Sequence, residues 1–185
     1  MTTMSTPRRS QQTGFTLIEL IVVIIILGIL AAVALPRFID LQVQARQAKL
    51  NAAIGAVRAG SALFHAQCLA QAAGNPPVPC PATTAAATVV MEGLNVTGVA
   101  QYPTADLAGI GAAAGLRAGI QADYTAAPGN FDYIIAGGGA NPNDVLTVSV
   151  PSPTVGSCAF TYTAGTAANN VVTAPVVTTT ATACN

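Results

Sequence analysis

The sequence predicts an α+β fold in which a long N-terminal α-helix is followed by an antiparallel β-sheet that packs on the second half of the helix. Three observations lead to this prediction: an apolar run near the N-terminus, apolar residues at helical spacing directly after it, and short alternating runs between Gly- and Pro-rich turns in the C-terminal part. We predict four segments: a leader peptide at 1–14, a hydrophobic transmembrane and assembly helix at 15–36, an amphipathic continuation of that helix at 37–74, and a β-rich globular head at 75–185.

Residues 15–35 form the apolar run, which contains 21 residues and a single charge, Glu19. A helix needs about 20 such residues to cross the ~30 Å hydrocarbon core of a bilayer. The alternative is a buried core helix, but such a helix rarely stays apolar on every side over six turns. We therefore expect this segment to lie in a membrane or to be covered by other subunits.

The 14 residues that precede this run form a polar segment, which includes Arg8 and Arg9 but no acid. A secretory signal peptide would have a small-residue cleavage site at a polar boundary after the apolar run, and this sequence has none there. A cut after Gly14 would instead remove the basic leader and leave the apolar helix on the mature chain. Arg8 and Arg9 favour a cytoplasmic leader.

Helical periodicity continues beyond Pro36, which lacks an N–H group and should disturb the helix. We predict one helix over 15–73 that is kinked or loosened between Gly28 and Pro36. Its buried stripe follows a 4-3-4-3-4 spacing, through Leu50, Ile54, Val57, Ser61, Phe64 and Cys68.

Short alternating runs in the C-terminal part predict strands at 131–135, 145–150 and 158–163, with a further candidate at 171–178. The segments 83–95 and 106–120 fit neither a strand nor a helix clearly. Two sets of alternating residues are expected to face the core, namely Leu146, Val148 and Val150 on one run, and Cys158, Phe160 and Tyr162 on the next.

The chain has four cysteines, an even number, in the part that we place outside the cell. Three pairings are possible, and proximity in the sequence favours Cys68 with Cys80 and Cys158 with Cys184. A zinc site is the alternative, but the sequence contains no C-x-x-C pair with an accompanying histidine. We therefore expect disulfides and no metal.

An enzyme or an anchored binding module is the competing class of protein. The chain has one histidine, His65, and one lysine, Lys49, and no nucleophile–base–orienter set stands out. Acid–base work would have to come from a carboxylate pair among Asp106, Asp123, Asp132 and Asp144, which we interpret as solvated loop acids. We therefore predict no catalytic residue and no cofactor. The zero net charge, from seven basic and seven acidic residues, also excludes a nucleic-acid-binding surface.

The residues Gly14-Phe15-Thr16-Leu17-Ile18-Glu19, followed by the aliphatic run, resemble the prepilin signal of type IV pilins and type II secretion pseudopilins. Residues 36–42 with Ala45 and Arg46 are similar to pilins of the mannose-sensitive-haemagglutinin type. The resemblance implies cleavage between Gly14 and Phe15 and N-methylation of Phe15. It also implies that Glu19 of an incoming subunit pairs with the new amine of Phe15 in a neighbour, and that Gly28 and Pro36 weaken the helix.

This resemblance implies a structural subunit of a type IV pilus, polymerised through its N-terminal helix into a helical homo-oligomer. The implied partners are a prepilin peptidase that also methylates, the inner-membrane assembly machinery, and the lipid bilayer before assembly. The subunit would cross the bacterial inner membrane once, with its head outside, and then join a surface fibre that could serve adhesion, twitching or DNA uptake. The alternatives are a pseudopilin, a minor pilin or a membrane-anchored binding module. The major pseudopilin has a calcium-binding loop near its C-terminus, and the absence of acids after Asp144 counts against such a loop here.

Overall fold

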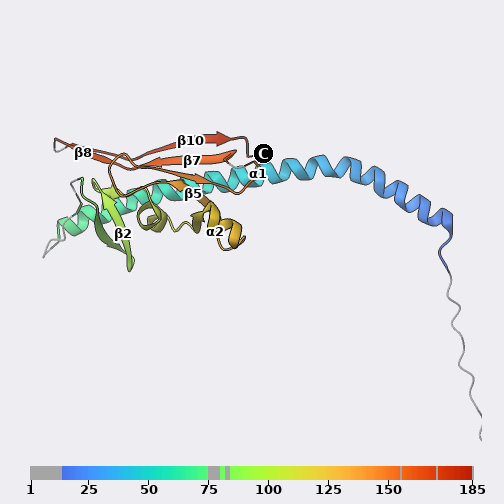
Figure 1. Ribbon diagram of the computed structural model, residues 1–185, viewed down its shortest axis with the longest axis horizontal. Helices are drawn as coiled ribbons and strands as arrows, with labels where there is room; N and C mark the ends of the chain where they lie inside the picture. Colours follow the sequence, from blue (N-terminus) through green and yellow to red (C-terminus); the bar gives the residue numbers. More distant parts are fainter. Residues whose placement is uncertain (1–13, 75–79, 82–83, 155, 170, 185) are drawn as a thin grey trace, which may run out of the picture. The chain divides into compact units, whose positions relative to one another are not determined.

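The computed structural model describes residues 14–74, 80–81, 84–154, 156–169 and 171–184. Residues 1–13 of the predicted leader and residues 75–79 at the start of the predicted head lie outside this description. The chain divides into two compact units, Met1–Leu41 and Gln42–Asn185 (Figure 1). The predicted α+β class is confirmed, because a long N-terminal helix is followed by β-sheets.

Helix α1 (Leu17–Ala72) is 56 residues long and contributes to both units. It continues through Gly28 and Pro36 without a break in its assignment, so the kink expected there stays a prediction. The buried stripe is confirmed, since all six residues predicted for it are buried in the second unit, namely Leu50, Ile54, Val57, Ser61, Phe64 and Cys68. A spacing of three and four residues placed them on one face, and the head covers that face.

The main sheet of the head has five strands in the order β10-β7-β6-β5-β4. Its strands are β4 (Ala118–Ile120), β5 (Tyr133–Gly137), β6 (Val145–Ser149), β7 (Cys158–Thr163) and β10 (Val176–Thr182). The predicted antiparallel pairing is found through most of this sheet, and the one exception is its edge, where β4 pairs with β5 in parallel. A parallel pair needs a crossover of about a dozen residues, usually helical. Helix α2 (Gln121–Ala126) lies within this connection.

Two smaller sheets complete the head. Strands β1 (Ala87–Met91), β2 (Leu94–Val99) and β3 (Tyr102–Pro103) form an antiparallel sheet, and β8 (Thr166–Ala168) pairs with β9 (Val171–Thr173). The candidate strand at 171–178 is in fact divided between β9 and β10 by Ala174 and Pro175, because proline interrupts a strand's hydrogen bonding. The segment 106–120, which the pattern left unassigned, contains a π-helical turn, η1 (Leu107–Gly111), and β4.

The core of the head lies between the second part of α1 and the five-stranded sheet. Both predicted sets of inward-facing residues are confirmed, and they join one cluster with the helix stripe, formed by Leu50, Ile54, Val57, Leu146, Val148, Val150, Cys158, Phe160 and Tyr162 among others. A second cluster, of Phe64, Cys68, Val89 and Val96, packs the later part of α1 against the three-stranded sheet.

Gly98 of β2 and Phe64 of α1 are expected to be energetically coupled. A Cβ atom added at Gly98 would overlap the Phe64 ring, with Cε1 only 2.8 Å away. Gly98→Ala should therefore lower the free energy of unfolding by about 1–3 kcal/mol, and Phe64→Leu in the same chain should recover part of that loss. Denaturant unfolding of the full chain in detergent measures the coupling. Gly55→Ala is the control, because nothing lies within 4 Å of its added Cβ, and additive effects of Gly98→Ala and Phe64→Leu would contradict the overlap.

Burial of Tyr162 predicts a loss of stability at alkaline pH. Its hydroxyl donates to the Pro103 carbonyl at 2.8 Å, and desolvation raises its pKa well above the ordinary 10.0. Burial, and then the charge of Asp132, raise the pKa of Tyr133 too. As the pH rises, the unfolded chain therefore loses these protons before the folded chain does. The contribution of the two tyrosines to the free energy of unfolding is fully present below pH 10 and falls as the pH rises above it. Unfolding measured against pH should show a shallower fall for Tyr162→Phe than for Tyr124→Phe, and equal slopes would contradict the assignment.

Candidate functional site

The predicted cleavage site lies in open chain just before α1. Gly14, Phe15 and Thr16 precede the first helical residue, and all three are exposed, Phe15 by 87%. No neighbouring group lies within 4 Å of the position that a Cβ on Gly14 would occupy. Among the described residues, none therefore covers the peptide bond between Gly14 and Phe15.

Thr16 caps the N-terminus of α1, a role that the sequence analysis missed. Its Oγ1 accepts a hydrogen bond from the Glu19 N–H at 3.3 Å, and its carbonyl accepts one from the Leu20 N–H at 3.3 Å. Thr-x-x-Glu before an apolar run is a capping-box pattern, so the signal was present in the sequence. The cap fixes the start of the helix immediately after Phe15, the residue that cleavage would make N-terminal.

Glu19 lies in the first turn of α1 with its side chain exposed. A carboxylate there is favoured by the positive end of the helix dipole. Within the part of the chain that the structure describes, the two ion pairs both involve Asp132, so Glu19 has no basic partner there. An acid in a membrane-length apolar segment is costly without a partner, and its position leaves the carboxylate available to one outside the subunit.

The first part of α1 leaves its apolar surface uncovered. Every large hydrophobic side chain from residue 17 to residue 41 is exposed by between 42% and 76%. Among the described helices, α1 is the one long and apolar enough to cross a membrane. Exposed apolar area of this extent marks a surface that a membrane or a protein partner covers. Gly28 and Pro36 lie within this surface.

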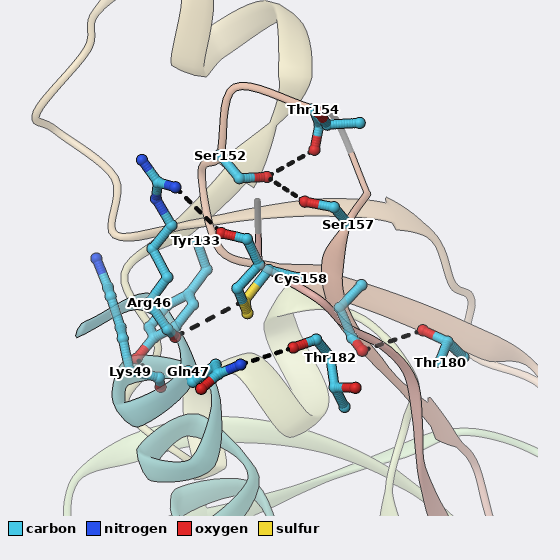
Figure 2. Close-up of a disulfide and its surroundings, with 12 residues drawn as sticks. Arg46, Gln47, Lys49, Tyr133, Ser152, Thr154, Ser157, Cys158, Thr180 and Thr182 are labelled. Atoms are coloured by element: carbon cyan, nitrogen blue, oxygen red, sulfur yellow. Dashed lines mark hydrogen bonds between the residues drawn. A yellow bond between two sulfur atoms is a disulfide. The ribbon is translucent and has the colours of Figure 1, made fainter. Parts of the chain in front are cut away.

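The structure joins the four cysteines as proximity in the sequence favoured. Cys158 is bonded to Cys184, which confirms the predicted disulfide, and Cys68 is bonded to Cys80. The C-terminal segment is also fastened to α1 by side chains. Gln47 donates to the Thr182 carbonyl at 3.1 Å (Figure 2), and Arg46 donates to the Cys184 carbonyl at 3.1 Å. Contacts between residues so far apart in the sequence carry no local signal, and the sequence analysis missed them.

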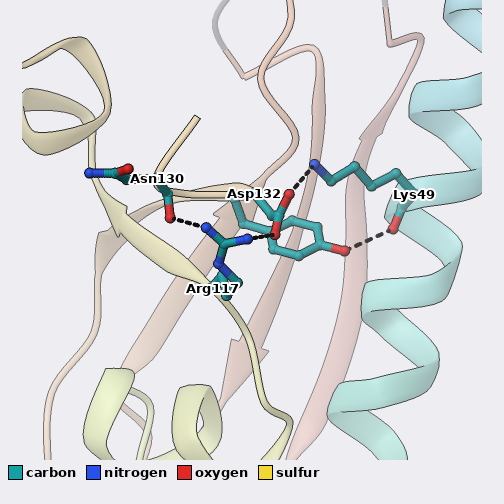
Figure 3. Close-up of polar contacts among 5 residues, drawn as sticks. Lys49, Arg117, Asn130 and Asp132 are labelled. Carbon is teal, nitrogen blue, oxygen red and sulfur yellow. Dashed lines mark hydrogen bonds and ion pairs between the residues drawn. The ribbon is translucent and has the colours of Figure 1, made fainter. Parts of the chain in front are cut away.

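Lys49 and the loop acids have structural contacts. Asp132 lies between Lys49 Nζ at 3.2 Å and Arg117 Nη1 at 3.7 Å (Figure 3). These side chains are more than one-third exposed, so each pair contributes about 0–1 kcal/mol. Asp106 accepts hydrogen bonds from the Gly109 N–H at 2.6 Å and from the Thr104 hydroxyl at 2.9 Å, and thereby caps η1. Asp144 similarly accepts from the Asn141 N–H at 2.8 Å.

The remaining candidates do not assemble a reactive site. His65 stacks on the Tyr102 ring with centroids 4.5 Å apart, and its Nδ1 lies 3.0 Å from the Gln101 carbonyl. Asp123 is exposed on α2. Among the described residues, no three His, Cys, Asp or Glu side chains gather as metal ligands would. The candidate site that stays is the segment 14–19, where the predicted cleavage position precedes a capped helix with one carboxylate in its first turn.

The segment around Gly14 and Glu19 matches a known N-terminal motif. The prokaryotic N-terminal methylation motif matches residues 9–35, so the chain carries a prepilin-type N-terminal segment. The chain is similar to the major component of the type IV narrow pilus of Thermus thermophilus, with 56% identity over 54 residues.

Two further relatives match over 54 residues each. They are the type II secretion system core protein G of Pseudomonas aeruginosa, at 52% identity, and the type IV major pilin of Myxococcus xanthus, at 41% identity. The three matches cover 28–29% of this chain and 47%, 34% and 24% of the respective relatives. The chain thus spans less than half the length of the curated relatives it matches. No solved structure matches the chain at a significant level.

Proposed function

We propose that this protein is the structural subunit of a type IV pilus. It is made as a precursor, cleaved between Gly14 and Phe15, methylated at Phe15 and polymerised through the first part of α1. The observation that carries the proposal is the uncovered apolar surface over residues 17–41. It begins directly after an exposed Gly14–Phe15 bond and holds Glu19, which has no basic partner among the described residues. Two relatives that match the chain over 54 residues are pilus components.

Assembly then follows from the two environments of that surface. In the inner membrane, lipid tails cover the apolar side chains and residues 1–14 remain cytoplasmic. Cleavage creates an amine at Phe15, and Glu19 of an incoming subunit pairs with the amine of a neighbour. Each buried ion is stabilised by the other, because an unpaired charge in a dry helix bundle is very costly. Gly28 and Pro36 let the helix bend or loosen as the bundle packs.

The remaining segments take the roles expected from the sequence. Residues 37–74 continue the helix into the head, and residues 75–185 form the domain displayed on the outside of the cell and then on the fibre. The prepilin peptidase and the inner-membrane assembly machinery are the proteins that the precursor meets. The head serves as a structural and surface domain, in keeping with the capping and packing contacts of its acids.

A pseudopilin of a type II secretion system is the second candidate function. The 52% identity to the core protein G over 54 residues supports it. The lack of acidic residues after Asp144 favours the pilus, since a C-terminal calcium loop of the pseudopilin kind would use carboxylates. A minor pilin at a fibre tip would have the same N-terminal segment.

Surface material sheared from cells that produce the chain is expected to contain fibres built from it. Electron microscopy with antibodies against the head, and mass spectrometry of the N-terminus, should show fibres whose subunits begin at methylated Phe15. Gly14→Val should leave the leader attached and abolish the fibres, whereas Gly55→Ala, on exposed helix, should leave both steps unchanged. Processed protein that stays in the membrane and never forms fibres would reject the pilus and favour a pseudopilin or an anchored module.

A further inference from the structure

A cleft lies on the head between α1, α2 and the chain that follows β6. It is formed by two adjoining pockets of about 300 and 390 Å³. The residues that line both pockets are Arg46 of α1, Tyr124 of α2, and Val150 and Pro151 after β6. All of them belong to the unit Gln42–Asn185. Pockets that bind small molecules have volumes of about 300–1,000 Å³, so this cleft, which we call the Arg46 cleft, has the size of such a site.

Arg46 brings to the cleft a positive charge that has no acidic partner among the described residues. The side chain is half-buried, and Figure 2 shows its guanidinium extending from α1 toward the loop that carries Ser152. Its Nη1 donates to the Cys184 carbonyl at 3.1 Å, and both ion pairs of the described chain involve Asp132 instead. A partly buried charge is costly without a counterion, and the planar guanidinium fits carboxylates and phosphates. The cleft therefore favours an anionic ligand.

The charges that line the cleft match a ligand with one negative charge. Lys49 and Asp132 line the second pocket and pair with each other at 3.2 Å (Figure 3). Together with Arg46, the lining residues hold two basic groups and one acidic group, which gives a net charge of +1. A carboxylate balances this charge, whereas a phosphate monoester carries about −1.5 to −2 near pH 7 and would be repelled by Asp132. The cleft is therefore better suited to a carboxylate.

The remaining lining combines flat apolar surfaces with a free polar group. Tyr124, Phe131 and Pro151 provide rings, and aromatic rings pack well against other flat groups. The side-chain amide of Gln121 has no hydrogen-bond partner among the described residues. Hydroxyl groups of a ligand lose their hydrogen bonds to water on binding and need such a partner in the site. A sugar ring uses both features, because C–H groups cover one of its faces and hydroxyl groups surround its rim.

The loop on one side of the cleft is fixed before a ligand binds. The Ser152 hydroxyl donates to the Thr154 carbonyl at 2.7 Å and lies 3.1 Å from the Ser157 hydroxyl (Figure 2). Pro151 and Pro153 restrict the backbone on either side of Ser152. A site that is already ordered loses little conformational entropy when it binds a ligand, and this raises its affinity.

We propose that the Arg46 cleft binds an acidic sugar, that is, a pyranose ring with one carboxylate. The carboxylate accepts hydrogen bonds from the Arg46 guanidinium, the apolar face of the ring packs on Tyr124, and a ring hydroxyl binds the Gln121 amide. The site lies in the head and does not depend on the proposed pilus.

Titration of the full-length chain with simple sugars tests the ligand. The chain is held in a zwitterionic detergent without a sugar headgroup, and binding is measured from the NMR signals of the added sugar. At least one of the two probes, glucuronate and galacturonate, should bind. The neutral sugar with the same ring, glucose or galactose, should bind about tenfold more weakly or worse, because it lacks the carboxylate. Acetate, which has the carboxylate without the ring, should also bind more weakly than the acidic sugar.

Variants of two lining residues test the site. Arg46→Gln removes the charge and Tyr124→Ala removes the ring, and each should weaken binding of the acidic sugar by about tenfold or more. Arg58→Gln, at an exposed position of α1, and Thr125→Ala, beside Tyr124 on α2, should bind like the wild type. Arg46→Lys should bind more weakly than the wild type but better than Arg46→Gln, since it keeps the charge without the planar fork.

The proposal is overturned if neither acidic sugar binds, if the neutral sugar or acetate binds as tightly, or if Arg46→Gln or Tyr124→Ala binds like the wild type. Thermal unfolding shows whether each variant is folded. If a variant is not, the comparison of acidic with neutral sugar on the wild-type chain still decides the ligand. Because this assay needs no fibre, its failure would leave the proposed pilus function standing.

Discussion

Replacing Glu19 with alanine is expected to abolish filament assembly while leaving membrane insertion and removal of the leader intact. The carboxylate is exposed in the subunit and has no basic partner among the described residues. In the assembled fibre its loss would strand the amine of a neighbouring Phe15 among apolar helices. Removing one member of a buried ion pair reduces association by about a hundredfold or more, and the loss recurs at every subunit.

Sheared fibre yield, compared with the amount of processed subunit in the membrane, measures this effect. Asp40→Ala is the matched control, because Asp40 is the other acidic residue of the unit Met1–Leu41 and is also exposed on α1. It should assemble normally. Glu19→Gln, which keeps the shape of the side chain without its charge, should behave like Glu19→Ala. Normal fibres from Glu19→Ala would remove the assembly role of this residue.

Removing the Cys158–Cys184 disulfide is expected to cause the largest loss of stability in the head. The bond joins residues 26 apart in the sequence, and closing a loop of this length stabilises the folded chain by about 3–4 kcal/mol in the chain-entropy model. The Cys158→Ser and Cys184→Ser double variant should lose this amount in urea unfolding of the full chain in detergent. Without this bond, the side-chain hydrogen bonds that join residues 182–184 to α1 are those donated by Arg46 and Gln47. The disulfide is therefore expected to be the stronger of the two attachments.

The second disulfide provides the comparison. Cys68 and Cys80 are 12 residues apart, and halving the loop length lowers the entropic contribution by about 0.6 kcal/mol. The Cys68→Ser and Cys80→Ser double variant should therefore lose slightly less stability than the first. If the first double variant unfolds at the same urea concentration as the wild type, the disulfide does not hold the C-terminal segment as we infer.

The parts of the fold that the sequence predicted are those with a strong local period. The stripe from Leu50 to Cys68 was predicted from its helical spacing. That spacing exists because the head covers one side of a regular helix, and apolar residues recur on the covered side. Strand β7 coincides with the predicted run at Cys158–Thr163, where buried and less buried residues alternate from Phe160 onward. The parallel pairing of β4 was not predictable in this way, because three residues carry no period and their partner is chosen by the crossover through α2.

In the candidate site, too, the local features were predictable from the sequence and the contacts between distant residues were not. The motif at Gly14 to Glu19 is local, and its pattern was enough to predict a prepilin-type segment, which the motif match over residues 9–35 bears out. Thr16 belonged to a recognisable capping box that the apolar run obscured. The ion pair of Lys49 with Asp132 joins residues 83 positions apart, so only the folded chain could identify it.

The disulfide between Cys158 and Cys184 also has a mechanical consequence. A fibre under tension pulls on its subunits, and force that opens a head normally lengthens the chain as strands peel away. The span between these two cysteines contains 26 peptide steps, which would supply roughly 90 Å of slack at about 3.4 Å per residue. The covalent bond keeps the two ends of this segment together. Strands β8, β9 and β10 therefore cannot extend under force, even if their hydrogen bonds break.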